Sequence, residues 1–151
     1  MSIEHDSWTV ERDYPQPPGR VFTAWADPAV KVRWFDLSGE PEPDYHSDFR
    51  VGGAETFRTA AGMRPRHAYD GQYRDIVNGE RIILTYEVSV DGLRASVSVA
   101  TVEFGATPAA GTHLLYTEQG AYLDGLDDAR SRRAGIRAQL DNLATVLKEL
   151  P

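Results

Sequence analysis

Residues 78–92, with the sequence NGERIILTYEVSVDG, decide the fold of this chain. Asn78-Gly79 and Asp91-Gly92 at the two ends favour tight hairpin loops, because these residues tolerate positive φ angles. Between them, apolar side chains alternate with mostly polar ones, as in an antiparallel strand with one solvated face. The apolar face carries Ile82, Leu84, Tyr86, Val88 and Val90.

Further strands are expected on both sides of this segment. One runs from about residue 66 to 77 before it, and two follow it, with inner faces that include Ser96, Ser98 and Val102 and then Leu114, Tyr116 and Glu118. A shorter strand carries Glu55, Phe57 and Thr59, and the first strand spans Trp8 to Tyr14. Gly39 to Asp44 is expected to be a loop, since it contains a glycine and two prolines.

Two short helices are expected after the first strand. Pro17 and Pro18 end that strand, because proline cannot donate to a sheet, and they suit the first turn of a helix. Asp27 can cap a second helix that has Pro28 at its first position. The buried side of this pair is expected to include Trp25 and Trp34.

A long helix is expected at the C-terminal end, beginning at Asp124 to Leu126 with Asp127 and Asp128 in its first turn. Its apolar residues recur at helical spacing, so one face can lie across a sheet. They are Ile136, Leu140, Leu143, Leu147 and Leu150. Together these elements predict an α+β fold in which a curved antiparallel sheet wraps one long helix.

The composition is that of one ordinary globular domain. The chain has 151 residues and a mass of 16.8 kDa, and we expect one domain over residues 1–151 with an ordered core at about 8–150. A net charge of -7 argues against a nucleic-acid partner and against an anionic membrane, since both need a basic face. There is no cysteine, and the first residues lack the pattern of a signal peptide, so we expect a cytoplasmic protein.

Several short motifs occur in a fixed order and cover most of the chain from Trp8 to Leu150. They are VFTAW at 21–25, Asp27-Pro28, RWF at 33–35, RVGG at 50–53, GQYRDI at 71–76, ERIILTY at 80–86, GTHL at 111–114 and the helix from Gly135. In this order they resemble the activator of heat-shock protein 90 ATPase homologue-like family, within the START/Bet v 1-like (SRPBCC) superfamily. The resemblance implies a helix-grip fold, with a ligand cavity between the sheet and the long helix.

Two positions depart from the pattern of that family. Ile136 replaces a tryptophan, which would enlarge the cavity, and Lys31 replaces an aliphatic residue. We expect Val30 or Val32 to take over the packing at Lys31. The activator that gives the family its name has a separate domain that engages the chaperone, and we do not expect that role in a chain of this length.

The predicted ligand cavity combines aromatic, aliphatic and a few polar side chains. Glu118 is the candidate acid or base, because burial among tyrosines raises the pKa of a carboxyl group. The alternative is that Glu118, like Glu55 on the shorter strand, lies at the cavity mouth or at a strand end in water. One of Arg130, Arg132 and Arg133 can turn inward to pair with Glu118 or a ligand anion, or all three can be solvated. The predicted lining is Trp25, Trp34, Phe57, Tyr69, Tyr73, Tyr86, Ser98, Tyr116, Glu118, Ile136, Gln139, Leu140 and Leu143.

Three functions follow as hypotheses. The first is binding of a small hydrophobic or amphipathic molecule in the cavity. The second is a cofactor-independent enzyme of the cyclase or hydrolase type, using Glu118 or a tyrosine. The third is a protein-interaction role such as stimulation of a chaperone ATPase. We expect no cofactor and no metal, since the histidines show no ligand spacing, and the sequence leaves open whether the chain forms a homodimer.

Overall fold

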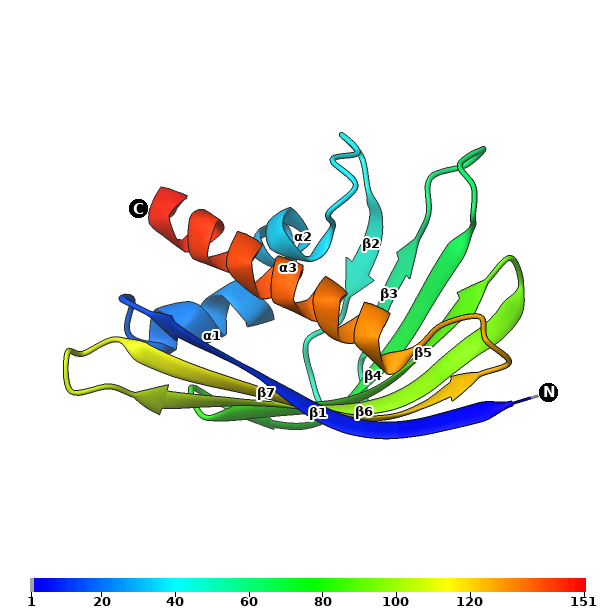
Figure 1. Ribbon diagram of the computed structural model, residues 1–151. Helices are drawn as coiled ribbons and strands as arrows, with labels where there is room; N and C mark the ends of the chain where they lie inside the picture. The colour runs from blue at the N-terminus through cyan, green and yellow to red at the C-terminus, as the bar shows by residue number, and fades with distance from the viewer. Residues whose placement is uncertain (1) are drawn as a thin grey trace.

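The computed structural model describes residues 2–151 as one seven-stranded sheet with three helices (Figure 1). The helices are α1 (Pro18–Ala26), α2 (Pro28–Phe35) and α3 (Ala129–Glu149). The strands are β1 (Ile3–Tyr14), β2 (Asp44–Ser47), β3 (Ala54–Arg58), β4 (His67–Val77), β5 (Arg81–Val90), β6 (Leu93–Ala106) and β7 (Thr112–Leu123). All neighbouring strands are antiparallel, in the order β1-β7-β6-β5-β4-β3-β2.

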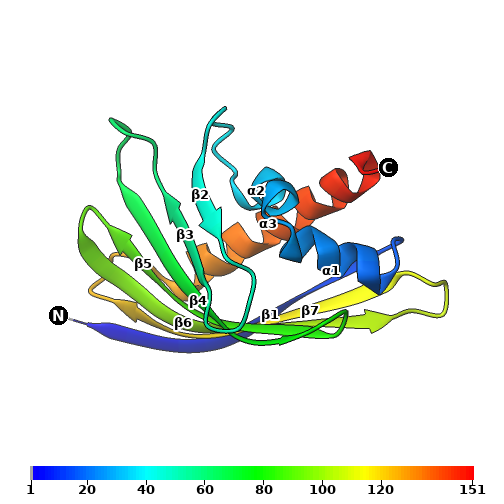
Figure 2. The same ribbon diagram turned by 180° about the vertical axis from the view of Figure 1, so that it is seen from behind.

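The sheet curves around α3, which crosses its concave side in both views (Figures 1 and 2). The chain leaves β1 at one edge of the sheet, forms α1 and α2, and re-enters at the opposite edge as β2. Both views also place the α2–β2 and β3–β4 loops on the same side of the sheet as α3. The predicted α+β helix-grip fold is confirmed.

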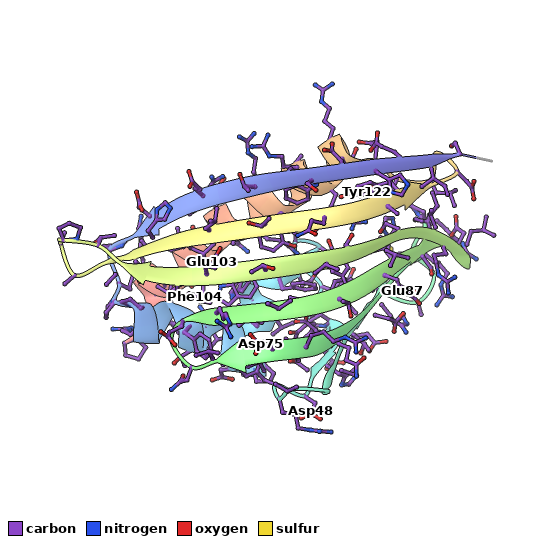
Figure 3. The ribbon with its side chains drawn as sticks, turned by 90° about the horizontal axis from the view of Figure 1, so that it is seen from below. Asp48, Asp75, Glu87, Glu103, Phe104 and Tyr122 are labelled. Atoms are coloured by element: carbon purple, nitrogen blue, oxygen red, sulfur yellow. The ribbon has the colours of Figure 1, made fainter. Side chains whose placement is uncertain are left out.

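The alternation predicted from residues 78–92 is present in β5. Asp91 and Gly92 both have positive φ angles, 50° and 82°, as a tight hairpin loop of this kind requires. Ile82, Leu84 and Tyr86 are buried on the concave side. In β6, neighbouring side chains also point to opposite faces of the sheet. Glu103 is exposed on the convex face shown in Figure 3, whereas Phe104 is buried beneath α1.

Three boundaries differ from the prediction. β1 begins at Ile3, because its polar first residues pair with β7 as far as Leu123. The predicted loop at 39–44 runs into an additional edge strand, β2. α3 begins at Ala129 and not at Asp124 to Leu126, because the positive φ angles of Asp124 and Gly125, 55° and 68°, turn the chain first. Asp128 then caps the helix, and its carboxylate accepts a hydrogen bond from the backbone N–H of Ser131.

Lys31 itself fills its position in α2, with a side chain that is 2% exposed, which the sequence did not predict. Val30 packs against the core as expected, although it is only partly buried, and Val32 is also partly buried. Asp27 caps α2 as predicted, with its carboxylate accepting from the N–H of Ala29 at 3.0 Å. In residues 2–151 no helix combines the length and hydropathy needed to cross a bilayer.

Candidate functional site

A cavity of about 470 Å³ lies between the concave face of the sheet and helices α2 and α3. Its wall is mainly aromatic and aliphatic. Aromatic rings come from α1, α2 and four strands, and α3 contributes Ile136 and Leu140. The exposed Leu37, Ser38 and His67 also line it, which places its mouth beside the loop after α2 and the start of β4.

Most of the predicted lining residues lie on this wall, and four lie behind it. Ser98 and Glu118 are covered by the tyrosines of β5 and β7. The hydroxyl of Tyr73 bonds to Ser47, and Leu143 is buried in the core. Those on the wall are Trp25, Trp34, Phe57, Tyr69, Tyr86, Tyr116, Ile136, Gln139 and Leu140.

Glu118 is fully buried and accepts hydrogen bonds from four hydroxyl groups. Its Oε1 accepts from Tyr86 at 2.5 Å and Tyr116 at 2.8 Å, and its Oε2 accepts from Tyr122 at 2.9 Å and Ser98 at 3.2 Å. Figure 3 marks Tyr122 near the edge of the sheet. Four convergent donors suit an ionised carboxylate, which can only accept hydrogen bonds. Glu118 therefore organises the inner faces of β5, β6 and β7.

Arg132 is the inward-facing arginine of α3, with a side chain that is 11% exposed. It donates to the hydroxyls of Tyr86 and Ser96 at 2.9 Å each, and forms an ion pair with Asp127. Its Nη1 lies 3.8 Å from Oε2 of Glu118. Burial by itself would lower the pKa of Arg132, but its partners outweigh this and raise the pKa. The guanidinium is thus charged and held by internal acceptors.

A second buried network joins α2 to β3 through an ion pair between Lys31 and Glu55. Glu55 is also fully buried and accepts from the hydroxyls of Tyr45 at 2.5 Å and Tyr69 at 2.8 Å. The Lys31 ammonium lies within 6 Å of the centres of four aromatic rings, which favours the cation. These rings belong to Trp25, Trp34, Phe35 and Tyr73.

The two members of this ion pair stay charged in spite of their burial. Burial lowers the pKa of Lys31, but the adjacent Glu55 carboxylate reverses this, and the net pKa is raised. Burial raises the pKa of Glu55, but Lys31 and the tyrosine hydroxyls lower it further than burial raises it. Burial also raises the pKa of Tyr69, Tyr86 and Tyr116, so all three keep their protons at neutral pH.

Gln139 is a polar side chain of α3 on the cavity wall, and a hydrogen bond to α2 fixes its orientation. Its amide nitrogen donates to the backbone carbonyl of Phe35 at 2.8 Å. The amide oxygen of Gln139 is therefore left as a hydrogen-bond acceptor on the wall.

Several wall residues were missed by the sequence reasoning. Leu84 and Val88 lie on the apolar face predicted for residues 82–90, so their periodicity was sufficient to include them, and Phe35 follows Trp34 directly in the RWF motif. Lys31 could not be found this way, because its burial depends on Glu55 from a distant strand. Among residues 2–151, no group of three or more His, Cys, Asp or Glu side chains is arranged to hold a metal ion.

Comparison with known proteins identifies one family and several solved structures. Residues 15–148 match the profile described as "Activator of Hsp90 ATPase homolog 1-like protein". An uncharacterised protein from Rhizobium leguminosarum is 42% identical, with a TM-score of 0.92 and coverage of 99% of this chain and 98% of that one. A protein from Rhizobium loti is 42% identical, with a TM-score of 0.88 and coverage of 97% and 99%. No curated protein matches the chain.

Proposed function

Since the chain belongs to the activator of Hsp90 ATPase homologue 1-like family, we propose that it binds a small hydrophobic or amphipathic molecule between the sheet and α3. The observation that carries this proposal is the cavity of about 470 Å³ with its largely apolar wall. Ligand pockets are commonly about 300–1,000 Å³ and combine an apolar wall with a few polar groups. Gln139 is one such group, since its free amide oxygen can orient a ligand that carries a donor.

An apolar cavity that is this large favours occupancy. Side chains that line a void lose dispersion contacts, and water in such a space needs several polar partners to be stable there. Most wall groups are carbon, and the hydroxyls of Tyr69, Tyr86 and Tyr116 are directed at the carboxylates of Glu55 and Glu118. A molecule with an aromatic or aliphatic body satisfies this wall better than water does.

The arrangement of Glu118 supports binding more than acid–base chemistry. Tyr86 and Tyr116 stand between Glu118 and the cavity, and both oxygens of Glu118 already accept hydrogen bonds. Any proton exchange with a bound molecule would have to pass through Tyr86 or Tyr116, and burial raises the pKa of both hydroxyls. We therefore assign Glu118 a positioning role for the wall.

The test uses the uncharged fluorescent probe N-phenyl-1-naphthylamine, whose emission increases in an apolar site. Ile136→Trp adds a large ring to the wall and should reduce probe affinity at least tenfold while the unfolding midpoint changes little. The matched control is Thr145→Trp, at an exposed position of the same helix that does not line the cavity. Equal probe binding in both variants would refute the cavity as the site.

Native mass spectrometry of the freshly purified protein complements this test. A discrete extra mass that disappears on denaturation, and that Ile136→Trp reduces, is the expected result. The same spectrum reports the oligomeric state. An extra mass retained by Ile136→Trp would place the ligand elsewhere and contradict the proposal.

A further inference from the structure

Every charged side chain on the cavity wall is engaged within the protein. The two cations are Lys31, paired with Glu55, and Arg132, paired with Asp127. The carboxylate of Asp36, also on the wall, accepts from the backbone N–H and the hydroxyl of Ser38 at 2.9 and 2.6 Å. A ligand that enters finds no cation without a carboxylate partner on this wall, as far as residues 2–151 are described.

The carboxylates also outnumber the cations around the cavity. Glu55 is paired with Lys31, and Glu118 and Asp127 lie beside Arg132. Asp36 adds a fourth carboxylate, which accepts from Ser38. An anion in the cavity would lose its hydration, and each of the two cations it could approach already has a carboxylate beside it. Groups of like charge repel each other far more strongly in a poorly hydrated site than in water.

The basic surface that adjoins the cavity lies outside it. Arg58, Arg64 and Arg66 border a separate hollow that shares only His67 and Ala68 with the cavity. The guanidinium of Arg58 is bound to Asp70 and to two backbone carbonyls, and Arg64 and Arg66 are exposed. Solvent and salt screen such exposed charges, so they do not offset the carboxylates of the interior.

We propose that the cavity selects uncharged aromatic molecules that carry a hydrogen-bond donor, and that it rejects organic anions of the same shape. This inference rests on the proposed ligand-binding function. The rings of Trp25, Tyr69 and Tyr86 provide the aromatic contacts, and the amide oxygen of Gln139 accepts from the donor. Arg132 is a poor anion anchor because the Asp127 carboxylate already neutralises its charge, and Asp127, Tyr86 and Ser96 take three of its five N–H donors.

The test compares two probes that differ by one charged group. N-phenyl-1-naphthylamine is uncharged, and 8-anilino-1-naphthalenesulfonate has the same two ring systems and amine with an added sulfonate. We expect the wild-type protein to bind the uncharged probe at least about tenfold more tightly, since one unfavourable charge contact in a partly buried site accounts for that factor.

A variant pair ties this preference to the charges on the wall. Asp127→Asn removes one carboxylate beside Arg132 and keeps an oxygen acceptor, so the affinity ratio should shift severalfold toward the sulfonate. Asp141→Asn removes the same charge from an exposed site, where the side chain is 66% exposed, and should leave the ratio unchanged.

The possible outcomes are distinct. A wild-type protein that binds the sulfonate as tightly as the uncharged probe overturns the charge selection but keeps the cavity as a binding site. An unchanged ratio in Asp127→Asn also overturns it, since the preference would then arise elsewhere. Failure of both probes to bind, or uncharged-probe binding that survives Ile136→Trp, contradicts the proposed function itself.

Discussion

Replacing Lys31 with methionine tests the buried ion pair between α2 and β3. Methionine has a similar length, so the change removes the charge and leaves little cavity. It also leaves the carboxylate of Glu55 fully buried, with only the hydroxyls of Tyr45 and Tyr69 as partners. Removing one member of a buried ion pair typically costs about 3–5 kcal/mol. We expect a loss near the lower figure, because the two hydroxyls remain.

This loss should be large enough to measure by thermal or urea unfolding. The entropy of unfolding is about 2.1 cal/mol/K per residue, so a chain of 151 residues loses roughly 3 °C of melting temperature for each kcal/mol. Lys31→Met should therefore melt about 10 °C below the wild-type protein. The double variant Lys31→Met/Glu55→Gln removes both charges and should recover at least half of the loss.

The pH dependence distinguishes this explanation from simple loss of packing. In the wild-type protein the pKa of Glu55 is lowered from 4.5, so its contribution is fully present above that value and is lost as the pH falls through the lowered pKa. In Lys31→Met, burial acts without the cation and should raise the pKa above 4.5. That variant should gain stability relative to wild type between pH 7 and 5, by up to about 1.4 kcal/mol per pH unit.

The double variant is the control for this slope, because it has no carboxyl group at residue 55. Its difference from the wild-type protein should stay constant between pH 7 and 5. The buried Lys31–Glu55 ion pair would be refuted by two results together. Lys31→Met would lose less than about 1 kcal/mol of unfolding free energy, and its difference from the wild-type protein would not become smaller between pH 7 and 5.

Two further predictions concern stability. Glu118→Gln replaces an acceptor of four hydroxyl hydrogen bonds by a group that is partly a donor, and should lower the free energy of unfolding by about 2–3 kcal/mol; an unchanged urea midpoint would contradict the network. Gly53→Ala should destabilise the protein, because a Cβ there would lie 1.9 Å from the carbonyl oxygen of Asp48. Gly135→Ala meets nothing within 4 Å in α3 and should instead add about 0.5–1 kcal/mol, which differential scanning calorimetry can resolve.

The sheet was predictable because its signals are local. Alternation with a period of two places Ile82, Leu84 and Tyr86 on one face whatever the rest of the chain does. Asp91-Gly92 places the hairpin loop between β5 and β6 in the same way, although a bulge at Val88 and Ser89 shifts the register beyond the first pairs. The helical spacing of Leu140, Leu143 and Leu147 then predicted the long helix that covers this face, and the family resemblance agreed with it.

The missed elements depend on partners that are distant in sequence. The first residues of β1 are polar and exposed, so no periodicity marks them, and they are extended because β7 pairs with them. β2 has only four residues and lies at the edge of the sheet. The start of α3 was placed too early, because Asp124 and Gly125 resemble a helix start in composition while their φ angles make a turn.

The side chains of the candidate site also fall into those that local sequence predicts and those that depend on distant partners. Aromatic wall residues follow from strand faces, but a lysine in a short helix reads as a surface residue until Glu55 is known to lie beside it. Arg132 was one of three inward candidates, and it is the one that faces the sheet because it lies four residues before Ile136, on the same face of α3. Sequence alone could place the cavity but not its charges.

The two buried networks also explain how a cavity between sheet and helix can keep its shape. Lys31 and Glu55 tie α2 to β3, and Arg132 ties α3 to β5 and β6 through Tyr86 and Ser96. Each of these networks contains buried charges, and separating them would cost free energy because each would be left without its partner. Both networks fix the position of a helix relative to the sheet, and because their charges pair internally, the rest of the cavity wall is mainly apolar. In the proposed charge selection, it is this internal pairing that leaves an entering anion without an unpaired cation on the wall formed by residues 2–151.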